Sequence, residues 1–340
     1  MTKKVNAHKK ITVIAEAGVN HNGDFAKALE LIDVAADCGA DFIKFQTFKA
    51  TNLVSASADL AAYQATTTSY GNQLEMLTDL ELKYEWHQGL IEHAESKSIG
   101  FITTPFDVEA IAFLSQLRME LFKIPSGEIT NLPYLREISK LGKRVILSTG
   151  MANLGEIETS IEALTSNGLD RDKITLLHCT TEYPAPIDEV NLSVMETLKN
   201  AFNLPVGYSD HTEGITISIA AAAMGAQIIE KHFTLDRRLP GPDHKASIEP
   251  DELNKMIESI RQVEQAFGSP LKQPSSSELK NLMSVRKSLV ASKFIEKGEQ
   301  FSLDNVTTKR PGSGISPMRM DEIIGRTASK SFKPDELIII

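Results

Sequence analysis

The sequence predicts an α/β protein built on a parallel TIM (β/α)8 barrel, followed by a small β-rich C-terminal domain. Eight short apolar runs occur within the first 233 residues and alternate with stretches of helical periodicity. Such alternation is typical of parallel βα units, and eight units in succession suit a closed barrel. This alternation of strand and helix patterns ends near Gly268, where a Pro/Ser-rich segment begins and shorter strand-like runs follow.

Most of the eight apolar runs end in a polar or titratable residue. The first four are ITVIA before Glu16, DFIKFQ with Lys44 and Gln46, IGFI before Thr103 and Thr104, and ELFKIP before Ser126. The other four are VILST around Ser148, ITLLHC with His178, LPVGY before Ser209, Asp210 and His211, and QIIE before Lys231 and His232. The C-terminal ends of barrel strands meet at one face, so we expect the chemistry there.

The stretches between these runs have the spacing of amphipathic helices. Residues 25–38 place apolar side chains three and four positions apart, and Gly39 follows as a stop. Similar stretches cover residues 73–98, 108–117, 132–141, 157–165, 190–199, 215–224 and 250–267. The polar segment 50–70 interrupts the pattern, and we expect it to form an insertion on the loop face that is either a lid or an excursion that contacts substrate.

The change in the residue pattern near Gly268, from alternating strand and helix segments to short strand-like runs, predicts the domain organisation. We expect a catalytic barrel over residues 1–267, a linker over 268–284 and a small domain of short strands and turns over 285–340. The segment GSPLKQPSSSE, at the start of the linker, is rich in Pro and Ser.

The composition excludes several classes of partner. The formal net charge of -9 argues against nucleic acid, whose phosphates require a basic face. Two cysteines, Cys38 and Cys179, cannot form a disulfide framework and suit a reducing cytoplasm. No run approaches the roughly 20 apolar residues of a membrane span, and the apolar stretch before Glu16 is too short for a signal-peptide core. We therefore expect a cytoplasmic protein without a membrane partner.

Two histidines are candidate metal ligands. His211 and His232 follow the seventh and eighth apolar runs, so their imidazoles could converge at the mouth of the barrel. Asp210 and Glu230 are neighbouring carboxylates that could orient such ligands. Glu16 is a third candidate ligand or a general base. The alternative is that both histidines are polar residues of the barrel rim, each bonded to a neighbour.

Three lysines lie within or just after apolar runs. Lys44, Lys123 and Lys231 would be costly to bury unless they point into a polar centre. Three ammonium groups directed at one mouth would form an anion site, with Thr104, Ser126 and Ser209 as hydroxyl donors. The Gly-containing turn in KIPSGE adds backbone N–H groups that suit phosphate or carboxylate.

Ten segments in order along the chain resemble those of one known family. They are AEAGVNHNGD, KFQTFKA, TPFD, KIPSGE, STGM, HCTTEYPAP, GYSDHT, EKHFTL, GPDHKAS and KRPGSGISP. Together they resemble the sialic acid (nonulosonic acid) synthases, and within that family the N-acetylneuraminate and N,N'-diacetyllegionaminate branch. The resemblance implies a phosphoenolpyruvate-condensing barrel followed by an antifreeze-like (SAF) domain.

The family's functional residues carry over onto matching positions of this sequence. The resemblance implies that Glu16, His211 and His232 are catalytic and that the two histidines bind a divalent metal. The phosphoenolpyruvate contacts would be Lys44, Thr104, Lys123, Ser126, Thr181 and Ser209. Thr181 departs from the pattern of some relatives, which have Asn there. The sugar contacts would be Gln46, Glu128, Tyr183, Asp243 and Arg310, the last reaching the sugar across a dimer.

The reaction implied is a transferase reaction. Phosphoenolpyruvate would condense with an open-chain 2-acetamido sugar and water, giving a nine-carbon 2-keto sugar acid and phosphate. The acceptor is either N-acetylmannosamine or 2,4-diacetamido-2,4,6-trideoxymannose, and GEITNLPYL and EAGVNHNGD mildly favour the second. The resemblance also implies Mn²⁺, with Mg²⁺ or Co²⁺ as alternatives, and a domain-swapped homodimer.

Two other functions remain open at this point. A metal-dependent hydrolase on the same barrel would require further ligands early in the chain, typically an HxH pair, and the first strand has none. A non-enzymatic carbohydrate-binding protein would leave the strand lysines and the strand-end histidines without a role.

Overall fold

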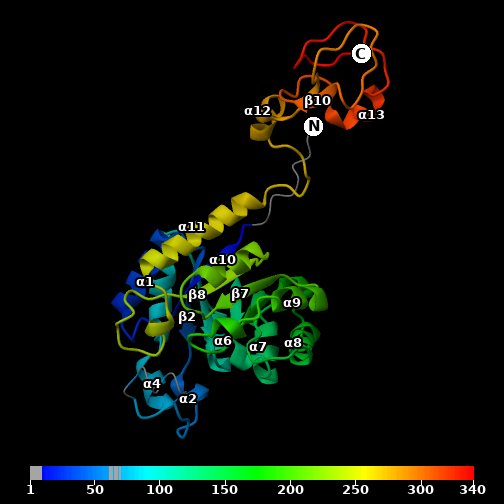
Figure 1. Ribbon diagram of the computed structural model, residues 1–340. Coiled ribbons are helices and arrows are strands. Elements are labelled where there is room, and N and C mark those ends of the chain that lie inside the picture. Colours follow the sequence, from blue (N-terminus) through cyan, green and yellow to red (C-terminus); the bar gives the residue numbers. More distant parts are fainter. Residues whose placement is uncertain (1–9, 61–63, 65–67, 69) are drawn as a thin grey trace. The chain divides into compact units, whose positions relative to one another are not determined.

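The computed structural model describes residues 10–60, 64, 68 and 70–340. The chain divides into two compact units, Met1–Gly268 and Ser269–Ile340 (Figure 1). None of the helices described is both long and apolar enough to cross a lipid bilayer.

The first unit is built around a parallel sheet of eight described strands. They are β1 (Thr12–Gly18), β2 (Phe42–Thr47), β3 (Gly100–Pro105), β4 (Leu121–Ile124), β5 (Arg144–Ser148), β6 (Ile174–Cys179), β7 (Val206–Asp210) and β8 (Ile228–His232). The strand order is β3-β2-β1-β8-β7-β6-β5-β4, and contact between β3 and β4 closes the sheet. The predicted TIM barrel is confirmed.

Helices follow the strands and cover the outside of the barrel. They are α1 (Phe25–Asp37), α5 (His87–Ser96), α6 (Val108–Leu114), α7 (Leu132–Ser139), α8 (Leu154–Ser166), α9 (Val194–Phe202), α10 (Thr216–Ala223) and α11 (Pro250–Phe267). The expectation of a single helix over residues 73–98 was wrong. Helix α4 (Gln73–Asp79), the short 3-10 turn Tyr84–Trp86 and α5 replace it.

Side chains along each strand point alternately out of and into the barrel, and this alternation gives two separate hydrophobic cores. Outward side chains such as Val13, Ile43 and Val145 pack against the helices in the main core. A smaller cluster fills the barrel interior with one residue from each of six strands: Ile14, Ile102, Leu121, Ile146, Leu177 and Ile228. Because side chains in a strand alternate between the two faces, residues two positions further along point into the barrel as well.

The insertion after β2 has a hydrophobic cluster of its own. Helices α2 (Ala50–Leu53) and α4 pack together. The cluster contains Val19, Phe48, Met76 and Leu80, each less than 5% exposed. Part of the predicted insertion, including residues 61–63 and 65–67, lies outside the described residues.

The second unit has a separate core. Strands β9 (Ser288–Ala291) and β10 (Val306–Lys309) pair antiparallel, and Phe301 and Phe332 pack edge to face within this core. Helix α13 (Met320–Ile323) also belongs to the unit. Helix α12 (Ser276–Val285) occupies most of the second half of the segment expected as a linker, and it begins with a capping box formed by Ser275 and Glu278.

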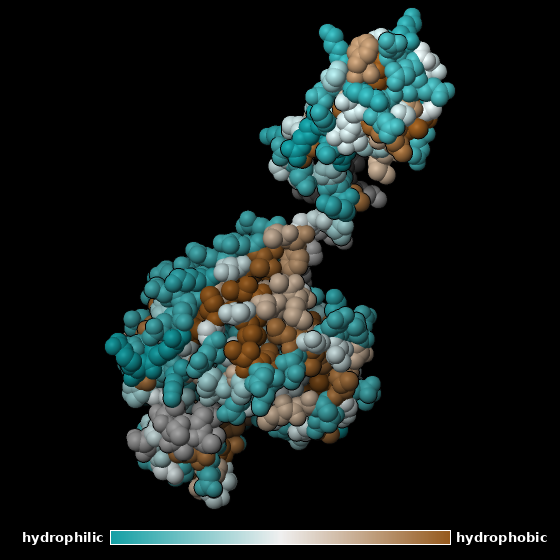
Figure 2. Space-filling model, in the orientation of Figure 1, coloured by the Kyte–Doolittle hydropathy of each residue, from teal (hydrophilic) through white to brown (hydrophobic). Residues whose placement is uncertain are grey.

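Helix α10 leaves an apolar area on the surface of the first unit. Figure 2 shows exposed hydrophobic atoms where Figure 1 places this helix. Ile217 and Ile219 are partly exposed, and Met224 is exposed at its C-terminal end.

Candidate active site

One cavity at the C-terminal ends of the strands receives a side chain from every strand of the barrel. The eight residues, in strand order, are Glu16, Lys44, Thr104, Lys123, Ser148, Cys179, Ser209 and Glu230. Six of them lie two positions after a residue of the interior cluster, as the alternation requires. The cavity has a volume of about 270 Å³, and residues beyond the strands complete it: Ser126, Thr181, Tyr183, His211 and His232 among them.

Lys44 is the centre of a buried ionic network in this cavity. Its Nζ lies 2.7 Å from a Glu16 carboxylate oxygen and 2.8 Å from one of Glu230. Glu230 also accepts a hydrogen bond of 2.8 Å from the Ser209 hydroxyl and lies 3.5 Å from Lys123. Burial lowers the pKa of Lys44 to about 7, against the opposing effect of Glu230. Burial would raise the pKa of Glu230, but Lys123 and Lys44 outweigh it and hold that pKa well below its ordinary value.

Hydrogen-bond donors also line this cavity. Gly150 donates its backbone N–H to the Ser126 hydroxyl at 3.0 Å. A Cβ on Gly150 would lie 2.2 Å from the Thr181 hydroxyl oxygen, so only glycine leaves room for these side chains. Among the described residues, the buried hydroxyls of Thr104 and Ser148 have no hydrogen-bond partner. Lysines and unsatisfied donors at one cavity suit a small anion such as a phosphate or carboxylate.

The two predicted metal ligands, His211 and His232, lie side by side. Their ring centroids are 5.7 Å apart. His211 donates its Nδ1–H to the Thr180 carbonyl at 2.6 Å, which leaves the lone pair on Nε2. Burial lowers the pKa of His211 to about 4, and burial with the nearby His211 and Lys44 charges lowers that of His232 well below its ordinary value. Both imidazoles are therefore neutral near pH 7, the form that binds metal ions.

Further observations bear on whether these residues fit a divalent metal. Within the described residues, Nδ1 of His232 and Oε1 of Glu16 are buried without hydrogen-bond partners. A Cβ built on Gly18 would lie 3.2 Å from that Glu16 oxygen and 3.3 Å from His232 Cε1, so the carboxylate and the imidazole border one space. Among the described residues, no three or more His, Cys, Asp or Glu side chains lie together so that they could hold a metal ion by themselves. The donors thus fit an open site, with two imidazoles as ligands and the remaining positions left to substrate or water.

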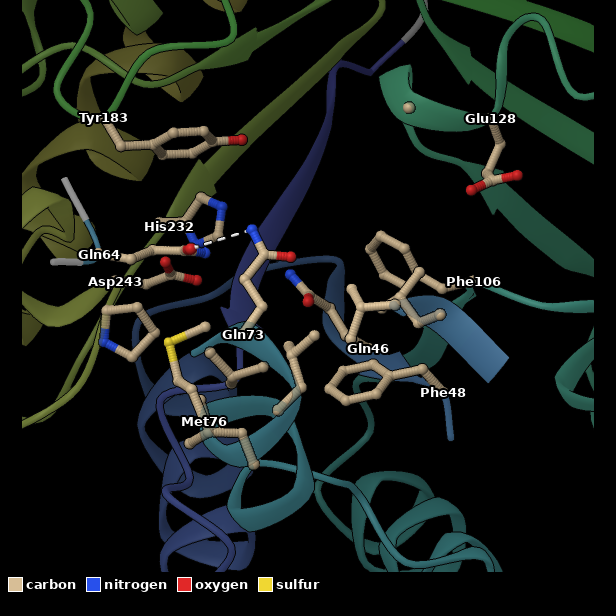
Figure 3. A pocket seen from close by; sticks show the side chains of 17 residues that line it. Gln46, Phe48, Gln64, Gln73, Met76, Phe106, Glu128, Tyr183, His232 and Asp243 are labelled. Carbon is tan, nitrogen blue, oxygen red and sulfur yellow. Dashed lines mark hydrogen bonds between the residues drawn. The ribbon is translucent and has the colours of Figure 1, made fainter. Parts of the chain in front are cut away.

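A second cavity adjoins the first and has a volume of about 330 Å³ (Figure 3). It contains four residues predicted to contact a sugar, namely Gln46, Glu128, Tyr183 and Asp243. Burial raises the pKa of Asp243 to about 6 and also raises that of Glu128. The two cavities share Gln46, Phe106, Gly127, Tyr183 and His232, so ligands in both would meet beside His232.

The structure corrects one part of the predicted anion site. Lys231 does not line the cavity but lies 3.2 Å from Asp210 and donates to the Thr212 carbonyl. Asp210 also accepts hydrogen bonds from Thr212 and Ser218 and does not orient a histidine. The reason is the alternation along β7 and β8. Because His232 points into the barrel, its neighbour Lys231 must point out.

Arg310 belongs to the second unit, where its Nε donates to the Val285 carbonyl at 2.9 Å. Apart from Lys231 and Asp210, the other predicted catalytic, phosphoenolpyruvate-binding and sugar-binding residues line one or both of the cavities in the first unit.

Sequence reasoning missed three contributions to these cavities. Glu230 was expected beside a histidine, but it contacts both lysines. Ser148 ends the fifth strand and lines the first cavity; the sequence placed it at a strand end, but no role was assigned to it. Gln64 and Gln73 line the second cavity from the insertion, and no strand-end pattern marks them.

The fold defines the class of protein as a parallel (β/α)8 barrel. Its two cavities, at the C-terminal ends of the strands, are lined by titratable residues. The chain belongs to the NeuB family, whose sequence model matches residues 31–272, and a SAF domain model matches residues 286–338. The predicted SAF domain is therefore confirmed.

The similarity to individual proteins extends over nearly the whole chain. An N,N'-diacetyllegionaminic acid synthase of Campylobacter jejuni is 59% identical and covers 97% of this chain and 99% of its own length. A protein of the same name from Legionella pneumophila is 46% identical and covers 94% of this chain and 91% of its own. The solved N-acetylneuraminic acid synthetase of Leptospira borgpetersenii superposes with a TM-score of 0.72 at 35% identity, over 81% of this chain and 90% of that one. These findings give no support to the hydrolase or the carbohydrate-binding alternative.

Proposed function

We propose that this enzyme condenses phosphoenolpyruvate with 2,4-diacetamido-2,4,6-trideoxymannose and water, giving N,N'-diacetyllegionaminate and phosphate. The observation that carries the proposal is the pair of adjoining cavities, one lined by lysines and hydroxyls and the other by the predicted sugar contacts, with His232 on their common border. The choice of sugar rests on the two relatives named as N,N'-diacetyllegionaminic acid synthases.

Phosphoenolpyruvate occupies the first cavity in this proposal. Lys44 and Lys123 neutralise its phosphate and carboxylate, and hydroxyls of Thr104, Ser126 and Ser209 donate hydrogen bonds to the same groups. Thr181, beside Gly150, completes the wall. Burial strengthens each of these interactions because water does not screen them.

The open-chain sugar occupies the second cavity, with its aldehyde on the border between the two. Gln46, Glu128, Tyr183 and Asp243 hold its polar groups. The terminal methylene carbon of phosphoenolpyruvate attacks the aldehyde carbon and forms the new C–C bond, which leaves the carbon bearing the phosphate oxygen electron-poor. Holding two small reactants next to each other contributes a large part of the acceleration.

His211 and His232 would hold a divalent metal, which we propose is Mn²⁺, and this metal would supply Lewis-acid polarisation of the aldehyde. Glu16 accepts a proton from the water that adds to the carbon bearing the phosphate oxygen. The C–O bond to phosphate then breaks, and phosphate leaves with the bridging oxygen. A Glu16 carboxylate oxygen lies 2.7 Å from the Lys44 Nζ, so the carboxylate borders the cavity that holds phosphoenolpyruvate.

The assembly forms part of the same proposal. The enzyme is a cytoplasmic, domain-swapped homodimer in which Arg310 of one subunit contacts the sugar bound to the other.

Phosphate release tests the function. The purified protein is mixed with Mn²⁺, phosphoenolpyruvate and either the diacetamido sugar or N-acetylmannosamine. We expect rapid phosphate release with the diacetamido sugar and slow or no release with the other. Phosphate release in the absence of sugar would refute the proposal, and so would the absence of release with either sugar.

A further inference from the structure

The residues of the second cavity fall into two sets. One set is shared with the first cavity and therefore borders the place where the C–C bond forms. The other set lines the second cavity alone, and it includes Val19, Phe48, Gln64, Gln73, Met76 and Leu80. If the aldehyde of the acceptor lies at the border, its fourth to sixth carbons extend toward the second set. This step rests on the proposed function.

The second set is largely apolar. Val19, Phe48, Met76 and Leu80 form the buried cluster of the insertion, and Leu53 and Leu77 pack against it and also line the cavity. A methyl group loses nothing by contacting such a surface. A hydroxyl placed there would give up its hydrogen bonds to water without replacement, which is unfavourable.

Gln73 is a polar group set among these apolar residues. It is the first residue of α4, and its Nε2 donates to Oε1 of Gln64 at 3.3 Å. This bond fixes which end of the Gln73 carboxamide faces Gln64. Figure 3 shows the Gln73 oxygen directed toward the middle of the cavity. A carbonyl oxygen in that position accepts a hydrogen bond, and an amide N–H is a suitable donor.

We infer that α4 determines the choice of acceptor: Gln73 accepts a hydrogen bond from the acetamido group on the fourth carbon, and the cluster of Phe48, Met76 and Leu80 receives the acetyl and terminal methyl groups. N-acetylmannosamine has a 4-hydroxyl, which would leave the place of the acetyl group empty, and a 6-hydroxyl, which would lie against apolar side chains. A site that matches one polar group and excludes another gives larger selectivity than apolar contact alone.

Three acceptors separate the parts of this inference. They are the 2,4-diacetamido-6-deoxy sugar, its analogue that keeps the 6-hydroxyl, and N-acetylmannosamine. For each variant we compare kcat/KM for the three sugars, with the KM for phosphoenolpyruvate and the melting temperature as checks. Gln73→Leu removes the acceptor oxygen. Gln73→Met also removes it, with an unbranched side chain that favours helix, and it replaces the first variant if Gln73→Leu does not fold. Gln88→Leu on the exposed side of α5 is the matched control.

We expect Gln73→Leu to reduce the preference for the diacetamido-6-deoxy sugar over N-acetylmannosamine by about tenfold or more. The ratio between the two diacetamido sugars should stay unchanged, since they differ only at the sixth carbon. An equal loss for all three sugars, or no loss for any, would overturn the inference. Failure of the wild-type protein to use any of the sugars would instead refute the proposed function.

Discussion

The Lys44 ammonium and the Glu230 carboxylate lie 2.8 Å apart inside the barrel, and both side chains are about 5% exposed. Glu230 also lies near Lys123 and accepts a hydrogen bond from Ser209, so one carboxylate contacts three residues of the predicted anion site. The two lysines that are proposed to bind phosphoenolpyruvate are therefore held in place by a group from the last strand of the barrel.

Removing the charge of Glu230 tests this relationship. Glu230→Gln should lower the free energy of unfolding by about 3 kcal/mol, because breaking a buried pair leaves ammonium groups without their counter-charge. Urea denaturation measures the loss, and Glu162→Gln on the exposed face of α8 is the control. Equal stability of Glu230→Gln and the wild type would show that the network does not support the barrel.

The histidine pair predicts metal binding that is measurable without turnover. Titration with Mn²⁺, followed by electron paramagnetic resonance, should show a tight site in the wild-type protein that His211→Ala and His232→Ala both lose. Phosphate release should fall to background in the same variants. His93→Ala, at a histidine paired with Asp33 on the outside of the barrel, should keep the site. Tight Mn²⁺ binding by either alanine variant would contradict the assignment.

Gly150 predicts a steric effect on the anion site. In Gly150→Ala the added Cβ would lie 2.2 Å from the Thr181 hydroxyl oxygen and 2.8 Å from that of Ser126, so both must move. We expect the KM for phosphoenolpyruvate to rise by about 10- to 100-fold. Gly155→Ala is the control, since its Cβ meets only the Asn153 side chain, at 3.3 Å. An unchanged KM would mean that these hydroxyls do not contact the substrate.

The barrel and most of its site follow from the sequence for a specific physical reason. A parallel strand buried on both faces is a short apolar run, and a polar residue at its C-terminal end is costly unless it faces a functional cavity. This reasoning placed Lys44, Lys123 and His232 correctly. It failed for Lys231, because neighbours in a strand point to opposite faces and His232 already occupies the inner one. Applying the two-residue alternation strictly would have selected Glu230 in its place.

The insertion could not be predicted to the same depth. Its cavity residues come from α2, α4 and the ends of β1 and β2, which approach one another only through the cluster around Phe48 and Met76. No periodic pattern in the segment 50–70 indicates which side chains face a ligand. Gln73 lies at the first position of α4, where a polar residue is ordinary, so its role depends on the fold.

Buried histidines predict how stability changes with pH. Burial lowers the pKa of His87 to about 4, and its Nε2 shares a short hydrogen bond with the Thr47 hydroxyl. Between the folded pKa and the unfolded pKa of about 6.5, the unfolded chain binds more protons. The free energy of unfolding must therefore fall as the pH drops through this window.

Urea denaturation at pH 7, 6 and 5 measures this slope. His87→Asn should reduce it by up to about 1.4 kcal/mol per pH unit, since one titrating group is lost. Gln88→Asn, the next residue of α5, changes no titrating group and should leave the slope as in the wild type. Identical slopes for His87→Asn and the wild type would refute the prediction.

The central claim is that the barrel joins phosphoenolpyruvate to the diacetamido sugar with cleavage of the enol C–O bond. The most direct test uses phosphoenolpyruvate with oxygen-18 in the bridge between the enol carbon and phosphorus, and mass spectrometry of both products. We predict that a nine-carbon diacetamido acid forms without the label and that the released phosphate carries it. Label retained in the sugar acid, or labelled phosphate without the nine-carbon product, would contradict the account.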